Sequence, residues 1–164
     1  MNMMLKVFTV AILFISVAFG SNLRDMLVIP IVTNCGNKDY SVFFYNMEIT
    51  EVERGKELIL ITNQGKSTRE FYNGTIQVTA TASGTAVLTG YAGICGYQEI
   101  KMPFGLGKIE IINPSCPIES NMYPSITMKT RLPIITPPGY YSFKLDATDG
   151  NNNKLFCINV SFKL

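Results

Sequence analysis

The chain has 164 residues, of which 47% are hydrophobic and only 16% are charged, against about 25% charged residues in an average soluble domain. Its 14 basic and 12 acidic residues give a net charge of +2 and form no basic stripe, which argues against a nucleic-acid-binding protein. The absence of histidine excludes Ser-His-Asp and Cys-His catalysis and, with no C-x-x-C pair, argues against a zinc site. So few charges indicate either a large core or a cavity lined by apolar side chains.

The first twenty residues have the layout of a secretory signal peptide. Lys6 precedes the uncharged apolar run Val7–Phe19, and small residues follow at Gly20 and Ser21. The run is shorter than the roughly 20 residues of a membrane-spanning helix. We predict a signal peptide over residues 1–20, a single domain over residues 21–164, and a secreted or lysosomal location.

Period-two alternation recurs along the rest of the chain, while helical periodicity is weak. In the clearest segment, Ile76 and Val78 face one way, and Gln77 and Thr79 face the other. We predict strands over residues 40–49, 57–62, 75–82, 85–91, 108–112, 125–131, 140–147 and 155–164. Short strands separated by Gly, Pro, Asn and Asp clusters predict an all-β antiparallel sandwich or barrel, and the periodicity does not choose between the two.

Four cysteines lie beyond the predicted signal peptide. An even number in a secreted chain predicts two disulfides, for which three connectivities exist. The spacing favours Cys95–Cys116, which closes a local loop, and Cys35–Cys157, which joins the start of the domain to its end.

Two N-glycosylation sequons are present, Asn73-Gly74-Thr75 and Asn159-Val160-Ser161. Asn73 lies at a predicted turn, and we expect it to be modified. Asn159 lies inside the last predicted strand, where we expect it to be less accessible.

The acidic residues fall at the ends of predicted strands and in turns, where charges are normally solvated. They are Glu48, Glu51, Glu53, Asp146 and Asp149. This placement does not favour two-carboxylate catalysis. We therefore predict a protein that is not an enzyme and has no catalytic, metal or cofactor site.

Proline lies beside aromatic and aliphatic residues in Tyr123-Pro124, in residues 132–135 and before Tyr140-Tyr141. Proline cannot join a central ladder, so these are edge, bulge or mouth positions. They are either ordinary packing or the rim of an apolar opening between two sheets.

The order of these features resembles the ML lipid-recognition domain family over Asn34 to Leu164. The resemblance rests on Cys116-Pro117-Ile118, Tyr123-Pro124, Leu132-Pro133, Gly139-Tyr140 and Leu155-Phe156-Cys157, and upstream on Cys35, Arg54-Gly55, Gly74–Ala82 and Cys95. The segment is similar to the branches of that family that bind sterols or transfer phosphatidylglycerol and phosphatidylinositol. Two features depart from the sterol-binding branch: no second cysteine follows Cys35 closely, and Ile158 stands where an aromatic residue often follows the last cysteine.

The resemblance implies an immunoglobulin-like β-sandwich with an apolar lipid cavity between its two sheets, and the disulfide pairing that the spacing favours. It implies that the cavity is bordered by Ile76, Val78, Tyr123, Pro124, Leu132, Tyr141 and Phe143. We expect a monomeric carrier that moves a sterol or glycerophospholipid between membranes through transient membrane contact. The alternatives are an activator that presents a glycolipid to a hydrolase, and an adhesion or recognition sandwich with a packed interior.

Overall fold

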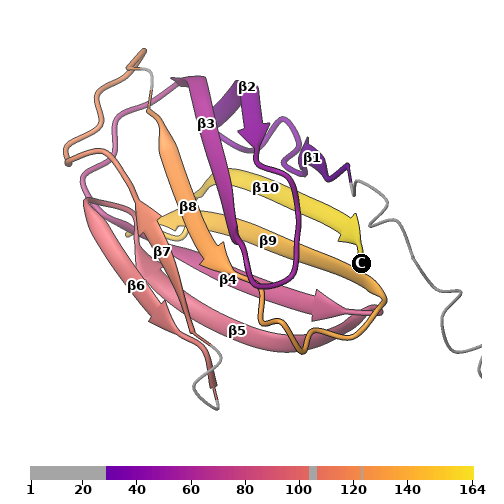
Figure 1. Cartoon of the computed structure of the whole chain (residues 1–164). Helices are drawn as coiled ribbons and strands as arrows, with labels where there is room; N and C mark the ends of the chain where they lie inside the picture. Colours follow the sequence, from indigo (N-terminus) through magenta and orange to yellow (C-terminus); the bar gives the residue numbers. More distant parts are fainter. Residues whose placement is uncertain (1–28, 104–106, 123) are drawn as a thin grey trace, which may run out of the picture.

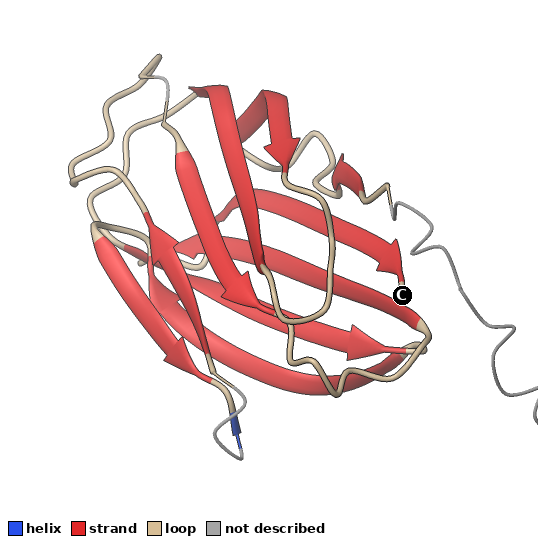
Figure 2. Cartoon of the chain, in the orientation of Figure 1, coloured by secondary structure: helices blue, strands red, loops and turns tan. Residues whose placement is uncertain are grey.

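The computed structural model describes residues 29–103, 107–122 and 124–164, so the predicted signal peptide and Tyr123 lie outside the described residues. These ranges contain strands and no α-helix; the short blue piece in Figure 2 is a single 3-10 residue, Pro103. The strands are β1 (Ile31–Asn34), β2 (Val42–Ile49), β3 (Glu57–Ser67), β4 (Gly74–Ala82), β5 (Thr85–Gly93), β6 (Tyr97–Lys101), β7 (Lys108–Ile112), β8 (Ile126–Arg131), β9 (Tyr140–Asp149) and β10 (Lys154–Lys163).

The strands form two antiparallel sheets that pack face to face (Figure 1). One sheet has the order β1-β10-β9-β4-β5, and the other has the order β2-β3-β8-β7-β6. The sequence left a sandwich and a barrel open, and the two separate sheets confirm the all-β sandwich.

Two strands were not predicted, β1 and β6. Both are short edge strands, and in β6 only Ile100 is buried, so alternation is barely visible in the sequence. Strand β3 continues five residues beyond the predicted end at Thr62, through the polar segment 63–67. That segment is held by backbone pairing with β2, which a polar sequence does not reveal.

The core lies between the inner faces of the two sheets. Alternation along β4, β9 and β10 buries Val78, Leu145 and Ile158, which are aligned in register across the three strands. The opposite sheet contributes Leu58, Leu60, Ile109, Ile111 and Met128. Each of these side chains stabilises the fold by about 1.5–3 kcal/mol through removal from water.

A glycine allows the two sheets to approach closely at one edge. Gly90 of β5 is buried, and a Cβ atom at this position would lie 2.5 Å from Cγ2 of Ile100 in β6. Since β5 and β6 are the edge strands of different sheets, this contact closes one side of the sandwich.

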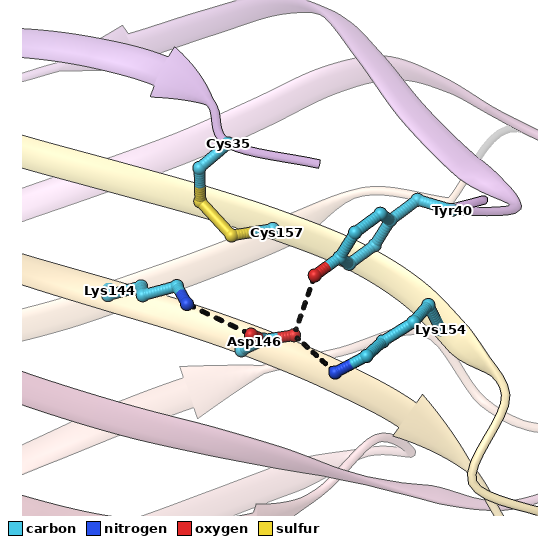
Figure 3. The surroundings of a disulfide bond; sticks show 6 residues. All are labelled: Cys35, Tyr40, Lys144, Asp146, Lys154 and Cys157. Carbon is cyan, nitrogen blue, oxygen red and sulfur yellow. Dashed lines mark hydrogen bonds and ion pairs between the residues drawn. A yellow bond between two sulfur atoms is a disulfide. The ribbon is translucent and has the colours of Figure 1, made fainter. Parts of the chain in front are cut away.

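Both favoured disulfides are present, Cys35–Cys157 and Cys95–Cys116. Beside the first, Tyr40 donates a hydrogen bond of 3.3 Å to Asp146, whose carboxylate also pairs with Lys144 at 3.0 Å (Figure 3). Burial, followed by the nearby Asp146 carboxylate, raises the pKa of Tyr40 above its ordinary value of 10.0. These contacts hold the connection between β1 and β2 against β9.

The two disulfides are expected to stabilise the fold unequally. Cys35–Cys157 spans 122 residues and Cys95–Cys116 spans 21, so loop entropy gives the first about 5 kcal/mol and the second about 3 kcal/mol. Replacing both cysteines of the long-range bridge with alanine should therefore lower the free energy of unfolding in urea by about 2 kcal/mol more than replacing the local pair. Equal losses would show that chain entropy does not set the difference.

Candidate functional site

The two sheets part at one end of the sandwich around an apolar pocket of about 510 Å³. Its walls come from β4, β5 and β9, from the segment after β6 and from the loop between β8 and β9. The lining residues are Ala80, Thr81, Ala82, Val87, Leu88, Met102, Pro103, Pro133, Ile135, Thr136, Pro137, Tyr141 and Phe143.

Small residues of β4 leave the space that the pocket occupies. Ala80 is the register partner of Phe143, and Ala82 is the partner of Tyr141, so each alanine lies beside an aromatic side chain on the inner face. The rings of Tyr141 and Phe143 stack on Phe162 of β10 at centroid distances of 5.8 and 6.2 Å. The aromatic stack thus forms a wall of fixed position.

A β-bulge turns an additional side chain of β5 toward the pocket. Ala80 pairs with Leu88 and Thr81 pairs with Ala86, which leaves Val87 as the extra residue on β5. In a regular strand, Val87 and Leu88 would point to opposite faces, whereas here both line the pocket. A bulge also bends its strand.

The β8–β9 loop, residues 132–139, forms the opposite wall. Its prolines at 133, 137 and 138 supply no N–H group and cannot extend β8. The loop is held instead by the turn between β2 and β3, where Arg54 Nε donates to the Thr136 carbonyl at 2.7 Å and the Gly55 N–H donates to the Leu132 carbonyl at 2.8 Å. Gly55 has a φ of 77°, which favours glycine at this turn.

The polar side chains of the pocket bond to the protein itself. Thr81 Oγ1 lies 2.7 Å from the Ser142 hydroxyl, and the Thr136 and Tyr141 hydroxyls each donate at 2.6 Å to carbonyls of the β8–β9 loop. No charged side chain is among the lining residues that the structure describes. Such a surface suits an apolar ligand.

The acidic residues at positions 146 and 149 have structural contacts away from the pocket. Asp149 pairs with Arg69 at 3.3 Å and accepts the backbone N–H groups of Asn151 and Asn153. Partial burial raises the pKa of Asp149, but the hydrogen bonds from Asn153 and Asn151 and the Arg69 charge outweigh it, so the net pKa is lowered. Among the described residues, no group of three or more acidic or cysteine side chains could hold a metal ion.

The structure separates the seven residues that the sequence placed at a cavity. Tyr141 and Phe143 line the pocket, and Leu132 is buried at the start of the β8–β9 loop. Ile76 and Val78 lie deeper on the same face of β4 as Ala80 and are fully buried in the core. Pro124 lines a second void of only about 10 Å³, together with Phe44 and Phe156, and Tyr123 is not described.

Several lining residues were missed by the sequence reasoning. Met102 and Pro103 follow β6, a strand that was not predicted, and Val87 and Leu88 depend on the bulge. Ala80 could have been found, because the alternation places it on the same face as Val78.

The two sequons differ in their surroundings. Asn73 is exposed in the segment that precedes β4. Asn159 is half-buried within β10, where its backbone lies between Thr33 of β1 and Lys144 of β9.

These features define a disulfide-bonded β-sandwich with an apolar pocket at one end. A model of the ML domain matches residues 31–164. The chain therefore belongs to the ML-domain family, as its cysteine and proline pattern indicated. No curated protein sequence matches the chain.

Two solved structures share the fold. One is a Niemann-Pick type C2 protein from the Japanese carpenter ant, with a TM-score of 0.57, 12% identity, and coverage of 81% of this chain and 98% of that one. The other is chicken MD-1 complexed with lipid IVa, with a TM-score of 0.53, 12% identity, and coverage of 85% and 91%. At this identity the likeness establishes the fold alone. None of the described segments forms a helix with the length and apolarity needed to cross a bilayer.

The contact from Arg54 is expected to fix the β8–β9 loop. Arg54→Met removes the donor to the Thr136 carbonyl, so loop amides, including that of Thr136, should exchange faster with deuterium while β9 is unaffected. The free energy of unfolding should fall by about 1 kcal/mol, since the side chain is only half-buried. Arg131→Met, at an exposed position, is the control. Unchanged loop exchange in Arg54→Met would show that the remaining contacts suffice.

Proposed function

We propose that this protein is a lipid carrier that encloses the hydrocarbon part of a sterol or glycerophospholipid and transfers it between membranes. The observation that carries this proposal is the apolar pocket of about 510 Å³ at the open end of an ML-domain sandwich. A hydrocarbon chain in water costs about 0.8 kcal/mol per methylene, so a pocket that covers it binds it without any catalytic group. A recognition sandwich with a packed interior would have no need of such a volume.

The proposed ligand wall is the aromatic side of the pocket. Tyr141 and Phe143 contact the chain, and Leu132 supports the loop that covers it. Val78 and Ile76 form the deeper layer, which the ligand reaches only if the sheets separate further. Pro124 and Tyr123 belong to the proposed site by sequence resemblance, although Pro124 lines the small void toward the other end of the sandwich.

The compartment of the proposed carrier is outside the cell or in a lysosome-like lumen. Two disulfides support an oxidising environment. Residues 1–20 would act as the signal peptide. Glycosylation at Asn73 fits its exposure, and Asn159 would be the less accessible of the two sequons. The carrier would act as a monomer and without a cofactor.

Membrane contact would occur through the β8–β9 loop. Ile134 and Ile135 expose 78% and 81% of their surface on this loop, and Ile135 also lines the pocket. Val87 is 57% exposed on the facing wall. Adjacent exposed apolar side chains at a pocket mouth are typical of a surface that contacts another apolar phase. Insertion of this loop would bring the mouth against the bilayer.

A carboxylate in the pocket should abolish lipid binding. Phe143→Asp places a charge in an apolar site, where its desolvation is strongly unfavourable. Native mass spectrometry with solvent extraction should find lipid on the unmodified protein and none on this variant. Leu88→Asp, at a half-buried lining position, is a second variant that disturbs the core less. Thr89→Asp, exposed on the same strand, is the control. Normal lipid content in folded Phe143→Asp and Leu88→Asp would refute the proposed site.

Loss of the exposed isoleucines should slow transfer more than it weakens binding. The double change Ile134→Ser and Ile135→Ser removes apolar surface that the membrane would cover, and a loss of about 1.4 kcal/mol corresponds to tenfold. We therefore expect vesicle-to-vesicle transfer to fall about tenfold or more. Ile112→Ser changes an exposed isoleucine on β7 and should leave the rate unchanged. Equal rates for all three proteins would exclude this loop from docking.

A further inference from the structure

The sandwich has a second concave surface, on the outside of the β1-β10-β9-β4-β5 sheet. Along β10, Ile158 and Val160 are fully buried, so Asn159 and Ser161 point to the outer face. Register pairing continues the row of Ser161 across the other strands through Ile31, Ser142 and Thr81. This row lines a groove of about 420 Å³, the outer groove, which lies at the same end of the sandwich as the apolar pocket and shares lining residues with it.

The lining of the outer groove combines apolar surface with hydroxyl groups. Ile29, Ile31 and Tyr140 are largely exposed in it, beside the three hydroxyl side chains of the row. Lys163 is its one charged lining residue in the described part of the chain, and the amine lies 5.2 Å from the centre of the Tyr140 ring. Sugars present apolar C–H faces and hydroxyl edges, so a surface of this mixed kind suits a carbohydrate.

A glycosylation sequon adjoins the outer groove. In Asn159-Val160-Ser161 the serine itself lines the groove, and Asn159 lies on the same face about 7 Å away along β10. Asn159 is half-buried between Thr33 and Lys144 on this face. Its side-chain amide makes no hydrogen bond within the described residues and is not enclosed, so a sugar can be attached to it without breaking a contact.

The surface on the other side of Asn159 is charged. Asp146 pairs there with Lys144 at 3.0 Å and with Lys154 at 3.8 Å, and it accepts the hydroxyl of Tyr40 (Figure 3). These groups are bonded to one another. A sugar on Asn159 therefore gains apolar contact by lying toward the outer groove.

We infer that Asn159 carries an N-linked glycan whose first sugars lie in the outer groove and cover Ile29, Ile31 and Tyr140. Attachment takes place before the chain folds, so the half-burial of Asn159 in the strand does not prevent it. The glycan covers apolar surface beside the mouth of the pocket and leaves the β8–β9 loop as the exposed apolar contact. This inference rests on the proposed passage through a secretory lumen and not on lipid binding.

The experiment uses the full chain secreted from cultured mammalian cells. Glycopeptide mass spectrometry should find sugar on both Asn73 and Asn159. Peptide-N-glycosidase F then releases the two glycans from the native protein. A glycan in the groove must leave it before cleavage, so its rate of release follows the fraction of protein in which it is free. We expect release from Asn159 to be about tenfold slower than from Asn73 in the native protein, and equally fast after reduction and unfolding.

Variants of the groove distinguish a glycan that occupies it from one that is merely close to the sheet. Tyr140→Ser removes an exposed ring and should speed native release at Asn159 several-fold. Ile31→Ser is a second groove variant with the same expected effect. Tyr91→Ser is the control, because Tyr91 is 67% exposed on the outer face of the same sheet, as Tyr140 is at 66%, but does not line the groove.

A second readout follows the protein chain instead of the sugar. Ser161→Ala removes the sequon, whereas Ser161→Thr keeps it at the same position. Strand β1 is an edge strand held by β10, and its Ile31 lines the groove. Loss of the glycan in Ser161→Ala should therefore speed deuterium exchange of the β1 amides, and Ser161→Thr should leave it unchanged.

The outcomes separate this inference from the proposed function. An unmodified Asn159 beside a glycosylated Asn73 would refute the inference and leave the secretory route standing. Equal native release at the two sites, slow release that neither groove variant changes, or equal β1 exchange in the two Ser161 variants would show that the glycan does not occupy the groove. Absence of sugar from both sequons would overturn the inference and the proposed secretory route together.

Discussion

The register between β4 and β9 is the constraint on which both the core and the pocket depend. Because side chains alternate along each strand, the register that pairs Val78 with Leu145 also pairs Ala80 with Phe143. The first pair is fully buried and packs the core, while the second sets an alanine beside an aromatic ring and leaves space. A slip of β4 by one residue would turn both Val78 and Ala80 toward solvent, so the stability of the fold and the position of the pocket cannot vary independently.

The β8–β9 loop turns the open end of the sandwich into a walled pocket. Its prolines prevent β8 from continuing as a strand, so the chain crosses this end as a loop. The carbonyls of the loop are bonded instead by Arg54, by Tyr141 and by the turn at Gly55. These hydrogen bonds take the place of strand pairing in the loop, and they keep the exposed side chains of Ile134 and Ile135 at the mouth of the pocket.

Local sequence predicted most of the fold, and two of the residues that line the candidate pocket. Alternation and residue composition identified eight of the ten described strands, and loop length favoured the correct cysteine pairs, because these are properties of the chain itself. Tyr141 and Phe143 were placed correctly on an inward face for the same reason. Val87 could not be placed, since its orientation depends on a bulge in the pairing of β5 with β4, and a bulge leaves no trace in alternation. Met102 was missed because β6, the strand before it, was not predicted. The single buried residue of β6 gives no alternation of apolar and polar residues.

The apolar lining of the pocket would bind a hydrocarbon chain without hydrogen bonds, which affects the free energy of the proposed transfer. The inside of a bilayer offers a hydrocarbon chain nearly the same environment as the pocket, so the chain gains little free energy from being in one rather than the other. Water between the two is the barrier, at about 0.8 kcal/mol for each exposed methylene. Insertion of Ile134 and Ile135 would remove that water by joining the mouth to the membrane. Exchange would then depend on docking of the loop.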